Sequence, residues 1–348
     1  MNSGEYFYNL TPDIILNSIE TLGFEPTGRY IPLNSIENRV YDIQIEDQIR
    51  LVVKFYRPAR WNHSQISEEH SFLKELELEE VPVLGPMVIG GESIFQTHGM
   101  YYAVWPLRNG RIVEELKGND LTRVGSLLGR LHMVGRKNQI QTRPNLDLPH
   151  YAKKALDFLI DGDWIQNQSL AKRYENTVKQ SFALYESVIK NYNIPFQRIH
   201  GDCHKGNLLV SKEGFCLLDF DDFLNGPVIQ DFWMLLPMGE SSSPGDLELF
   251  LDGYQMFSDF DRNWLQLIEP LRIIRYVHYA AWIAKRWLDP SFPSIFPHFG
   301  TEEYWLKETI DLESAGQELK IDLAIDEIET KPDKTELSNK DFFWDWEG

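Results

Sequence analysis

Hydrophobic residues recur at two different spacings in the first part of the chain. Between Thr11 and Gly23 the apolar positions are three and four apart, which predicts an amphipathic helix that Thr11 caps and the glycine ends. Residues 40–45 and 51–56 alternate apolar and polar positions on either side of Glu46-Asp47-Gln48. That pattern predicts two antiparallel strands joined by a tight turn.

A second helix and three more strands complete this region. Helical spacing returns at Ser64 and continues until Val81-Pro82-Val83. Short strands are predicted at residues 87–89, 93–96 and 100–105. Together these segments predict a small antiparallel sheet that carries one helix.

After Pro106 the pattern changes to long helices. Because the helices follow the sheet rather than alternating with it, the sequence predicts an α+β fold with two lobes. We assign residues 1–105 to an N-terminal lobe, residues 106–320 to a helical C-terminal lobe, and residues 321–348 to an acidic tail that we expect to be disordered. Helical periodicity marks the segments 120–137, 168–191, 228–237, 245–257 and 265–288.

Composition narrows the classes of partner. The chain has 34 Lys and Arg against 53 Asp and Glu, a formal charge of −19, which opposes the basic surface that nucleic acid requires. It has no stretch of about 18 apolar residues and no apolar signal core at the N-terminus. Its two cysteines, Cys203 and Cys216, favour neither a disulfide framework nor a cysteine zinc site. We expect a cytoplasmic protein with no nucleic-acid or membrane partner.

Polar residues gather in a short non-helical insert between the long helices. Residues 200–207 fit the pattern H-x-D-x-x-x-x-N, and Asp219-Phe220-Asp221 follows an apolar strand twelve residues later. Phosphoryl transfer requires a carboxylate near the acceptor hydroxyl and oxygen ligands for magnesium. We therefore predict Asp202 as the catalytic base, Asn207 and Asp219 as ligands of Mg²⁺, and ATP as the phosphate donor. The alternative is a polar turn in which both aspartates are ordinary turn formers.

A single lysine interrupts the apolar strand Leu51-Val52-Val53-Lys54. A lysine that points inward needs a counter-charge, and in kinases such a lysine reaches the α- and β-phosphates and pairs with a helix glutamate. We choose Glu69 as the partner, because Leu73 and Leu76 would share its buried side, and keep Glu68 as the alternate. The alternative for Lys54 is an edge-strand side chain whose charge reaches water.

Other residues near the motif have competing interpretations. Asp231 is either a helix-start acid that the helix dipole favours or, as we prefer, an acceptor for backbone amides of the catalytic loop. His200 is predicted to brace that loop, since a zinc site from His200, Cys203 and His204 has poor spacing. Cys203 is at most a secondary candidate for a redox sensor. The aromatic segment 342–346 is either a docking segment or an inert end.

Several segments together resemble one known family. They are residues 34–41, residues 53–58, the Asp202 loop, and residues 225–236, which read Asn-Gly-Pro-Val-Ile-Gln-Asp-Phe-Trp-Met-Leu-Leu. They resemble the bacterial stress response kinase A family, which belongs to the aminoglycoside phosphotransferase and choline kinase-like group. The resemblance runs from about residue 10 to about residue 310.

The resemblance implies a bilobal protein kinase-like fold and a cytoplasmic, magnesium-dependent serine/threonine protein kinase that acts under stress. It implies that Asp202 accepts the proton, that Asn207 and Asp219 bind magnesium, and that Ser35 contacts the nucleotide. Residues 33–41 lack G-x-G-x-x-G, so side chains such as Ser35 or Asn38 must meet the phosphates. D-F-D replaces D-F-G and no A-P-E follows, which argues against activation-loop phosphorylation.

Two other functions compete with a protein kinase. The first is a small-molecule hydroxyl kinase of the aminoglycoside, choline or homoserine type, since the acidic balance suits a cationic acceptor. The second is a nucleotide-binding pseudokinase, which the presence of Lys54, Asp202, Asn207 and Asp219 disfavours. The expected partner is therefore a protein serine or threonine, or a small hydroxyl substrate, and we expect the protein to be a monomer.

Overall fold

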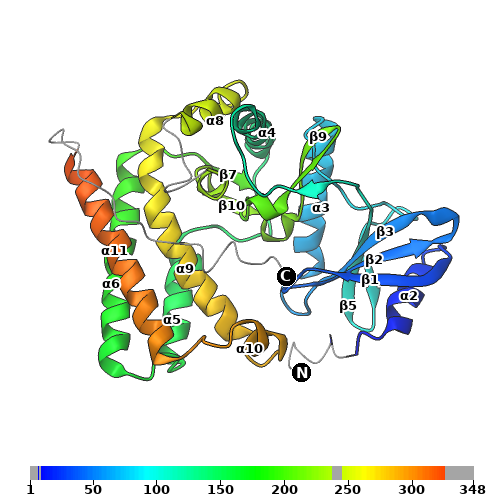
Figure 1. The fold of residues 1–348 in the computed structure, drawn as a ribbon, viewed down its shortest axis with the longest axis horizontal. Coiled ribbons are helices and arrows are strands. Elements are labelled where there is room, and N and C mark those ends of the chain that lie inside the picture. Colours follow the sequence, from blue (N-terminus) through cyan, green and yellow to red (C-terminus); the bar gives the residue numbers. More distant parts are fainter. Residues whose placement is uncertain (1–6, 8, 237–244, 326–348) are drawn as a thin grey trace.

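A five-stranded antiparallel sheet lies at one end of the molecule and the helical part at the other (Figure 1). The computed structural model describes residue 7, residues 9–236 and residues 245–325, with side chains as far as residue 314. The strands occur in the spatial order β1-β2-β3-β5-β4. This part of the fold consists of α2 (Pro12–Glu20), β1 (Pro26–Leu33), β2 (Arg39–Ile45), η1 (Glu46–Gln48), β3 (Arg50–Phe55), α3 (His63–Leu78), β4 (Phe95–Thr97) and β5 (Met100–Pro106).

The alternation of β3 decides where Lys54 points. Successive side chains of a strand face opposite sides of the sheet. Val53 packs in one hydrophobic cluster with Ile19 of α2, whereas Val52 packs beside Ile66 of α3 in another. Lys54 has the same parity as Val52, so its side chain faces α3.

Helices make up most of the remainder of the chain. Helix α9 packs against α5 and α6, and α11 packs against α6 (Figure 1). Short strands lie between these helices and the sheet (Figure 1) and carry the loops of the candidate site. These elements are β6 (Arg111–Ile112), α4 (Asn119–Gly135), η2 (Leu148–Lys153), α5 (Lys154–Asp161), α6 (Gln168–Asn191), β7 (Phe196–Ile199), η3 (Lys205–Asn207), β8 (Leu208–Ser211), β9 (Gly214–Leu217), η4 (Phe220–Asp222), β10 (Leu224–Pro227), α7 (Gln230–Trp233), α8 (Asp246–Tyr254), η6 (Arg262–Leu267), α9 (Ile268–Lys285), α10 (Ser291–Ile295) and α11 (Glu302–Ile325).

The predicted α+β class, with a sheet followed by helices, is confirmed, but several elements differ. Residues 87–89 form no strand, because Ile89 makes only an isolated bridge to Glu92 across the glycine turn between them. The helix expected at residues 228–237 is limited in the described residues to the single turn α7. Strand β1 was not predicted, because it is an edge strand with mostly exposed residues and no apolar alternation.

The sequence pattern predicted no helix after residue 288 and an acidic tail from residue 321, whereas the structure has α11 at Glu302–Ile325. Helix α11 continues to Ile325, past the boundary at residue 320 where we expected a disordered tail to begin. Residues 326–348, including the aromatic segment 342–346, lie outside the described residues. Within the described part of the chain, no helix has the length and apolar character needed to cross a membrane.

Glycines allow α4 and α8 to cross in direct contact. A Cβ atom added at Gly253 of α8 would lie 1.9 Å from the Thr122 carbonyl oxygen, and one added at Gly125 of α4 would lie 2.0 Å from the Phe250 carbonyl oxygen. Real Cβ atoms essentially never approach another heavy atom within 3.0 Å. Neither position therefore accepts a side chain unless the two helices separate.

We expect Gly253→Ala to lower the melting temperature markedly. Alanine favours a helix by about 1 kcal/mol over glycine, but overpacking a tight contact costs about 1–3 kcal/mol and here involves rigid backbone. The control is Gly245→Ala at the exposed start of α8, where a Cβ meets nothing within 4 Å. Thermal unfolding of both variants tests this, and equal melting temperatures would contradict the role of the crossing.

Candidate active site

The loop between β7 and β8 carries the H-x-D-x-x-x-x-N motif and is held by hydrogen bonds. Asp231 of α7 accepts the backbone N–H groups of His200 and Gly201 at 2.8 and 2.9 Å. His200 Nε2 donates to the Leu218 carbonyl oxygen at 2.8 Å, and the Asp202 N–H donates to His200 Nδ1 at 3.3 Å. The predicted bracing roles of Asp231 and His200 are confirmed.

Asp231 is itself held from the helical side. Its carboxylate is fully buried, and His132 Nε2 lies 3.2 Å from Oδ2. His132 Nδ1 in turn lies 2.9 Å from the hydroxyl of Tyr254. Because His132 belongs to α4 and Tyr254 to α8, the glycine-mediated helix crossing is connected to the catalytic loop through three buried polar side chains.

Asp202 lies between basic and amide side chains. Its Oδ1 contacts Arg275 of α9, and its Oδ2 lies 3.5 Å from both His204 Nε2 and Asn207 Nδ2. Burial alone would raise the pKa of Asp202, but the Arg275 and His204 side chains hold that pKa well below its usual range. Asp202 is therefore ionised at neutral pH.

Lys54 joins the sheet to the end of strand β9. Its Nζ lies 3.0 Å from Asp219 Oδ1, 3.2 Å from Asp221 Oδ1 and 3.7 Å from Glu69 Oε1. Burial lowers the pKa of an ammonium group, but the surrounding carboxylates raise the pKa of Lys54 well above its usual value. The charged lysine is stable at this depth because acidic groups from two separate elements surround it.

Asp219 has a left-handed backbone conformation and a partly exposed side chain. Its φ angle is 54°, which is uncommon for a residue other than glycine, and its side chain is 51% exposed. The preceding Leu218 donates its N–H to the Asn207 carbonyl oxygen at 2.9 Å. The pairing of β8 with β9 therefore brings the two predicted magnesium ligands to neighbouring positions in the fold.

The donor set of Asn207 and Asp219 fits a hard cation. Asn207 donates its amide nitrogen to the Asp202 carbonyl oxygen at 2.9 Å, so its amide oxygen is the atom directed elsewhere. Carboxylate and amide oxygens are ligands that Mg²⁺ accepts. The described residues contain no cluster of three or more His, Cys, Asp or Glu side chains that could hold a metal by themselves.

Glu69 and Glu68 have different partners. Glu69, which is buried, is the one that lies beside Lys54 and also 3.5 Å from Arg143 Nη2. Glu68 instead accepts the backbone N–H groups of Thr142 and Arg143 at 2.7 and 2.9 Å. Helical geometry turns adjacent residues by about 100°, so only one of the two glutamates can face the sheet.

Asp221 is a structural carboxylate in this site. Its Oδ2 accepts the Asn38 amide at 3.0 Å and contacts the Arg60 guanidinium. Arg143, which is fully buried, donates to the Asp221 carbonyl oxygen at 2.7 Å. Asp221 is 3% exposed, so most of its carboxylate is surrounded by protein.

The turn between β1 and β2 is anchored to the helical part. Glu37 accepts Arg286 Nη2 at 2.7 Å and the indole Nε1 of Trp282 at 2.8 Å, and both partners lie at the C-terminal end of α9. Ser35 Oγ accepts the N–H of Asn38 at 3.3 Å, a bond that closes the turn. The predicted nucleotide contact of Ser35 remains a prediction.

The environment of Cys203 argues against a redox role. Its side chain is fully buried, and burial raises the pKa of its thiol well above the ordinary value. His200 is committed to the Leu218 carbonyl oxygen. A zinc site built from His200, Cys203 and His204 is absent from the described residues.

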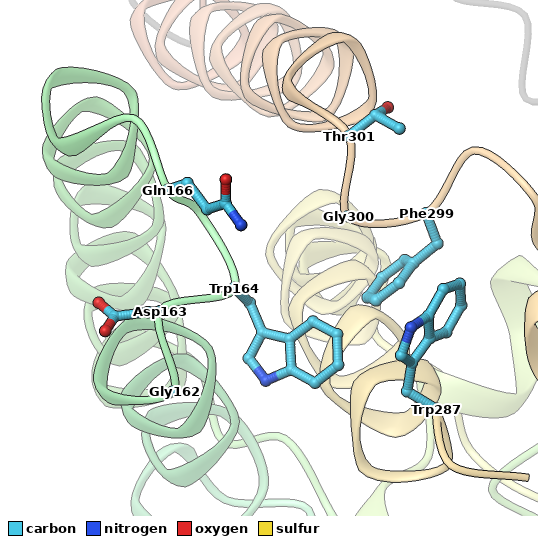
Figure 2. Close-up of a pocket in the computed structure, with 8 residues that line it drawn as sticks. All are labelled: Gly162, Asp163, Trp164, Gln166, Trp287, Phe299, Gly300 and Thr301. Atoms are coloured by element: carbon cyan, nitrogen blue, oxygen red, sulfur yellow. The ribbon is translucent and has the colours of Figure 1, made fainter.

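A pocket of about 430 Å³ lies away from these residues, and none of the candidate site residues lines it. It lies between the segment after α5 and the segment before α11 (Figure 2). Phe299 packs against Trp164 and Trp287 with ring centroids 5.7 and 5.3 Å apart. We interpret this cluster as aromatic packing between helices.

Comparison with known proteins identifies the family. The model of a phosphotransferase enzyme family matches residues 29–268. The chain is 40% identical over 310 residues to stress response kinase A of Escherichia coli (strain K12), and the match covers 88% of this chain and 93% of that protein. The chain belongs to the stress response kinase A family of phosphotransferases. It is also 39% identical, over 89% of this chain and 94% of the relative, to serine/threonine protein kinase RdoA of Salmonella typhimurium (strain LT2).

Solved structures share the fold of this stress response kinase A family member at much lower identity. An amicoumacin kinase in complex with AMP-PNP, Ca²⁺ and Ami has a TM-score of 0.67 at 18% identity and covers 85% of this chain and 95% of its own. A microcompartment-associated aminopropanol kinase has a TM-score of 0.67 at 16% identity, and the match covers 91% of this chain and 99% of that kinase. The predicted kinase-like fold and family are confirmed.

Sequence reasoning missed the arginines of this site. Arg275 contacts Asp202, and Arg60 contacts Asp221, yet neither lies within the motifs that identified the carboxylates. Arg143 lies in a loop whose pattern predicted no element. The predicted carboxylates were the one available signal for these arginines. Each carboxylate that becomes buried requires a compensating charge or hydrogen-bond donor.

We expect Glu37→Gln to weaken the anchoring of the β1–β2 turn. The glutamine amide is neutral, so the Arg286 guanidinium loses its charged partner. Loss of a charge-assisted hydrogen bond lowers the free energy of unfolding by about 1–3 kcal/mol. The melting temperature should fall, and nucleotide affinity should fall with it because the same turn holds Ser35, the predicted nucleotide contact, and binds Asp221 through Asn38. Glu25→Gln, on the exposed segment before β1, is the control, and its values should match wild type. An unchanged melting temperature for Glu37→Gln would contradict the anchor.

Proposed function

We propose that this chain is an ATP- and magnesium-dependent serine/threonine protein kinase that transfers the γ-phosphate to a hydroxyl. The observation that carries the proposal is the set of contacts that joins Asp202 to Asn207 and Asp219 to Lys54, with Leu218 linking the two pairs, within a phosphotransferase family. Each residue type matches a step that phosphoryl transfer needs.

Asp202 is the group suited to the acceptor. It is ionised, 21% exposed and held in a loop that Asp231 fixes through two backbone amides. In the proposed reaction the acceptor hydroxyl gives its proton to Asp202, its oxygen forms a bond to the γ-phosphorus, and the bond from that phosphorus to the β-phosphate oxygen breaks to release ADP. Loop rigidity matters because small displacements of a catalytic group reduce the rate steeply.

Asn207 and Asp219 are suited to hold magnesium, and Lys54 to contact the phosphates. Magnesium, when bound, would neutralise charge on the phosphate oxygens. The ammonium group of Lys54 lies beside the carboxylates of both Glu69 and Asp219. The amicoumacin kinase complex with AMP-PNP and Ca²⁺ supports nucleotide and cation binding by this fold. Ser35 is proposed as a further nucleotide contact from the β1–β2 turn.

The names of the relatives support the choice of acceptor. The Salmonella relative is named a serine/threonine protein kinase and the Escherichia coli relative a stress response kinase. From these names we propose a protein serine or threonine as the acceptor and a role in stress response. Small-molecule kinases among the solved structures favour a second candidate, phosphorylation of a small hydroxyl compound such as an amino alcohol.

Phosphate transfer by the purified full-length chain tests the proposal. Radiolabelled ATP with magnesium is offered with a serine protein substrate and, separately, with a panel of amino alcohols. Label on protein serine or threonine supports the protein kinase, and label on the amino alcohol alone favours the second candidate. Nucleotide binding with no transfer to any acceptor, in wild type as in Asp202→Ala, would identify a pseudokinase.

We expect Asp219→Ala and Asp202→Asn to affect different steps. Loss of the Asp219 carboxylate should abolish magnesium-dependent nucleotide binding, whereas Asp202→Asn should leave binding near wild type and lower kcat by about 10²- to 10⁴-fold. Calorimetric titration with a non-hydrolysable ATP analogue measures nucleotide binding. Initial rates of phosphate transfer measure kcat. Asp161→Ala, at the exposed end of α5, is the control. Equal losses of nucleotide affinity in both site variants would disprove the division of roles.

We expect Ser35→Ala to weaken nucleotide affinity up to about tenfold, because one hydrogen bond contributes about 0.5–1.5 kcal/mol. The same variant also loses the bond from the Asn38 N–H to Ser35 Oγ. Titration of the analogue, run together with thermal unfolding, separates the two roles. A lower melting temperature with unchanged affinity would mean that Ser35 only closes the turn.

A further inference from the structure

Arg275 lies beside Asp202 in the candidate site. It lies on α9, far from the motif loops in sequence, and its Nη2 contacts Asp202 Oδ1. Both side chains are partly accessible, at 15% for Arg275 and 21% for Asp202. An acceptor hydroxyl that approaches Asp202 must therefore come close to a guanidinium group.

Tyr151, His278 and two aspartates lie near Arg275. Tyr151 stacks on His278 with ring centroids 3.7 Å apart and planes at 8°, and His278 Nδ1 lies 3.1 Å from the Tyr151 carbonyl oxygen. Burial lowers the pKa of His278 to about 3, so this ring is neutral at physiological pH. The carboxylates that act on Arg275 include those of Asp202 and Asp222. Asp222 is also bound by Arg60, so a second guanidinium lies on the same side.

On the basis of the proposed function, we propose that Arg275 selects an acceptor with a carboxylate or phosphate group close to the reacting hydroxyl. A guanidinium binds either group through two N–H donors in a planar arrangement. An acceptor with an amine in that position would place a second cation beside Arg275, and the two like charges would repel. The acceptor class is therefore anionic, unlike the amino alcohols of the second candidate function.

The same contact couples acceptor binding to the availability of the base. In the structure one oxygen of Asp202 is occupied by Arg275. When the anionic group of the acceptor takes over Arg275, Asp202 Oδ1 becomes available for the hydroxyl proton. Asp202 keeps His204 and Asn207 near Oδ2 during this exchange, so the carboxylate stays in position.

The net charge of −19 does not oppose an anionic acceptor at this range. At physiological ionic strength, exposed charges farther away than about 8 Å are largely screened. An acceptor at Asp202 lies within contact distance of Arg275, whereas Arg60 is paired with Asp221 and Asp222. Long-range repulsion would lower the rate of encounter more than the affinity after contact.

Acceptor selectivity of the full-length chain tests this proposal. The acceptors are two serine peptides that differ only in flanking residues, aspartates in one and lysines in the other, together with glycerate as a small hydroxy acid and ethanolamine as an amino alcohol. The variants are Arg275→Gln and Arg275→Lys. The control is Arg272→Gln, one turn earlier on α9, where the arginine pairs with Glu269 at 2.6 Å.

We expect wild type to prefer the aspartate-flanked peptide over the lysine-flanked one in kcat/KM. Arg275→Gln should reduce that preference by roughly 10- to 100-fold, the value of a charge-assisted hydrogen bond. Arg275→Lys should retain part of it, and Arg272→Gln should leave it unchanged. Phosphate transfer to glycerate but not to the peptide would mean that the anionic acceptor is a small hydroxy acid. Transfer to both would support recognition of the anionic group whatever molecule carries it.

Two results would overturn the inference. The first is an equal fall in kcat on all acceptors in Arg275→Gln, which would make Arg275 a residue that only positions Asp202. The second is a wild-type preference for ethanolamine or the lysine-flanked peptide. If Arg275→Gln does not fold, Arg275→Lys and the wild-type preference still decide the question. No ADP formation by wild type with any acceptor would overturn the proposed function as well.

Discussion

The buried ammonium group of Lys54 is the constraint around which the site is organised. Lys54 belongs to a central strand of the sheet and is 7% exposed, and a charge at that depth is costly unless opposite charges surround it. Glu69 from α3 and Asp219 with Asp221 from the segment after β9 provide those charges. One desolvated cation thereby holds the sheet, its helix and the strand end of the helical part in a common position.

A series of ion pairs and hydrogen bonds connects this centre to the β1–β2 turn and the end of α9. Asp221 binds Arg60 and Asn38, and Asn38 also accepts the N–H of Arg57 at 3.0 Å. Arg57 lies 2.9 Å from Asp289, beyond the end of α9, and Glu37 binds Arg286. Because each member is at least partly buried, removing one partner leaves another charge without compensation. These contacts fix the β1–β2 turn against the helical part without a glycine-rich loop.

A separate network determines the position of the catalytic loop. It begins at the crossing of α4 and α8, continues through Tyr254 and His132 to Asp231, and ends at two backbone amides beside Asp202. The loop is thus positioned by helix packing, whereas the surroundings of Lys54 are positioned by ion pairs. Arg275 joins the two parts, because it belongs to α9 and contacts the carboxylate of the loop.

Local patterns in the sequence determined the elements and the chemistry of this protein. The hairpin at residues 40–56, the helix that carries Glu69 and the loop with Asp202 and Asn207 could be predicted, because period, turn residues and motif spacing are local properties. The edge strand β1 could not, because its residues are mostly exposed and carry no apolar alternation.

Only the tertiary structure decided which charges meet. The choice of Glu69 over Glu68 depends on which side of α3 faces Lys54, and the pairing of Arg275 with Asp202 joins residues 73 positions apart. Coulombic partners of a buried group are selected by packing distance, which sequence separation does not encode. For that reason the sequence predicted a phosphotransferase with its carboxylates, and the structure alone revealed the arginines that surround them.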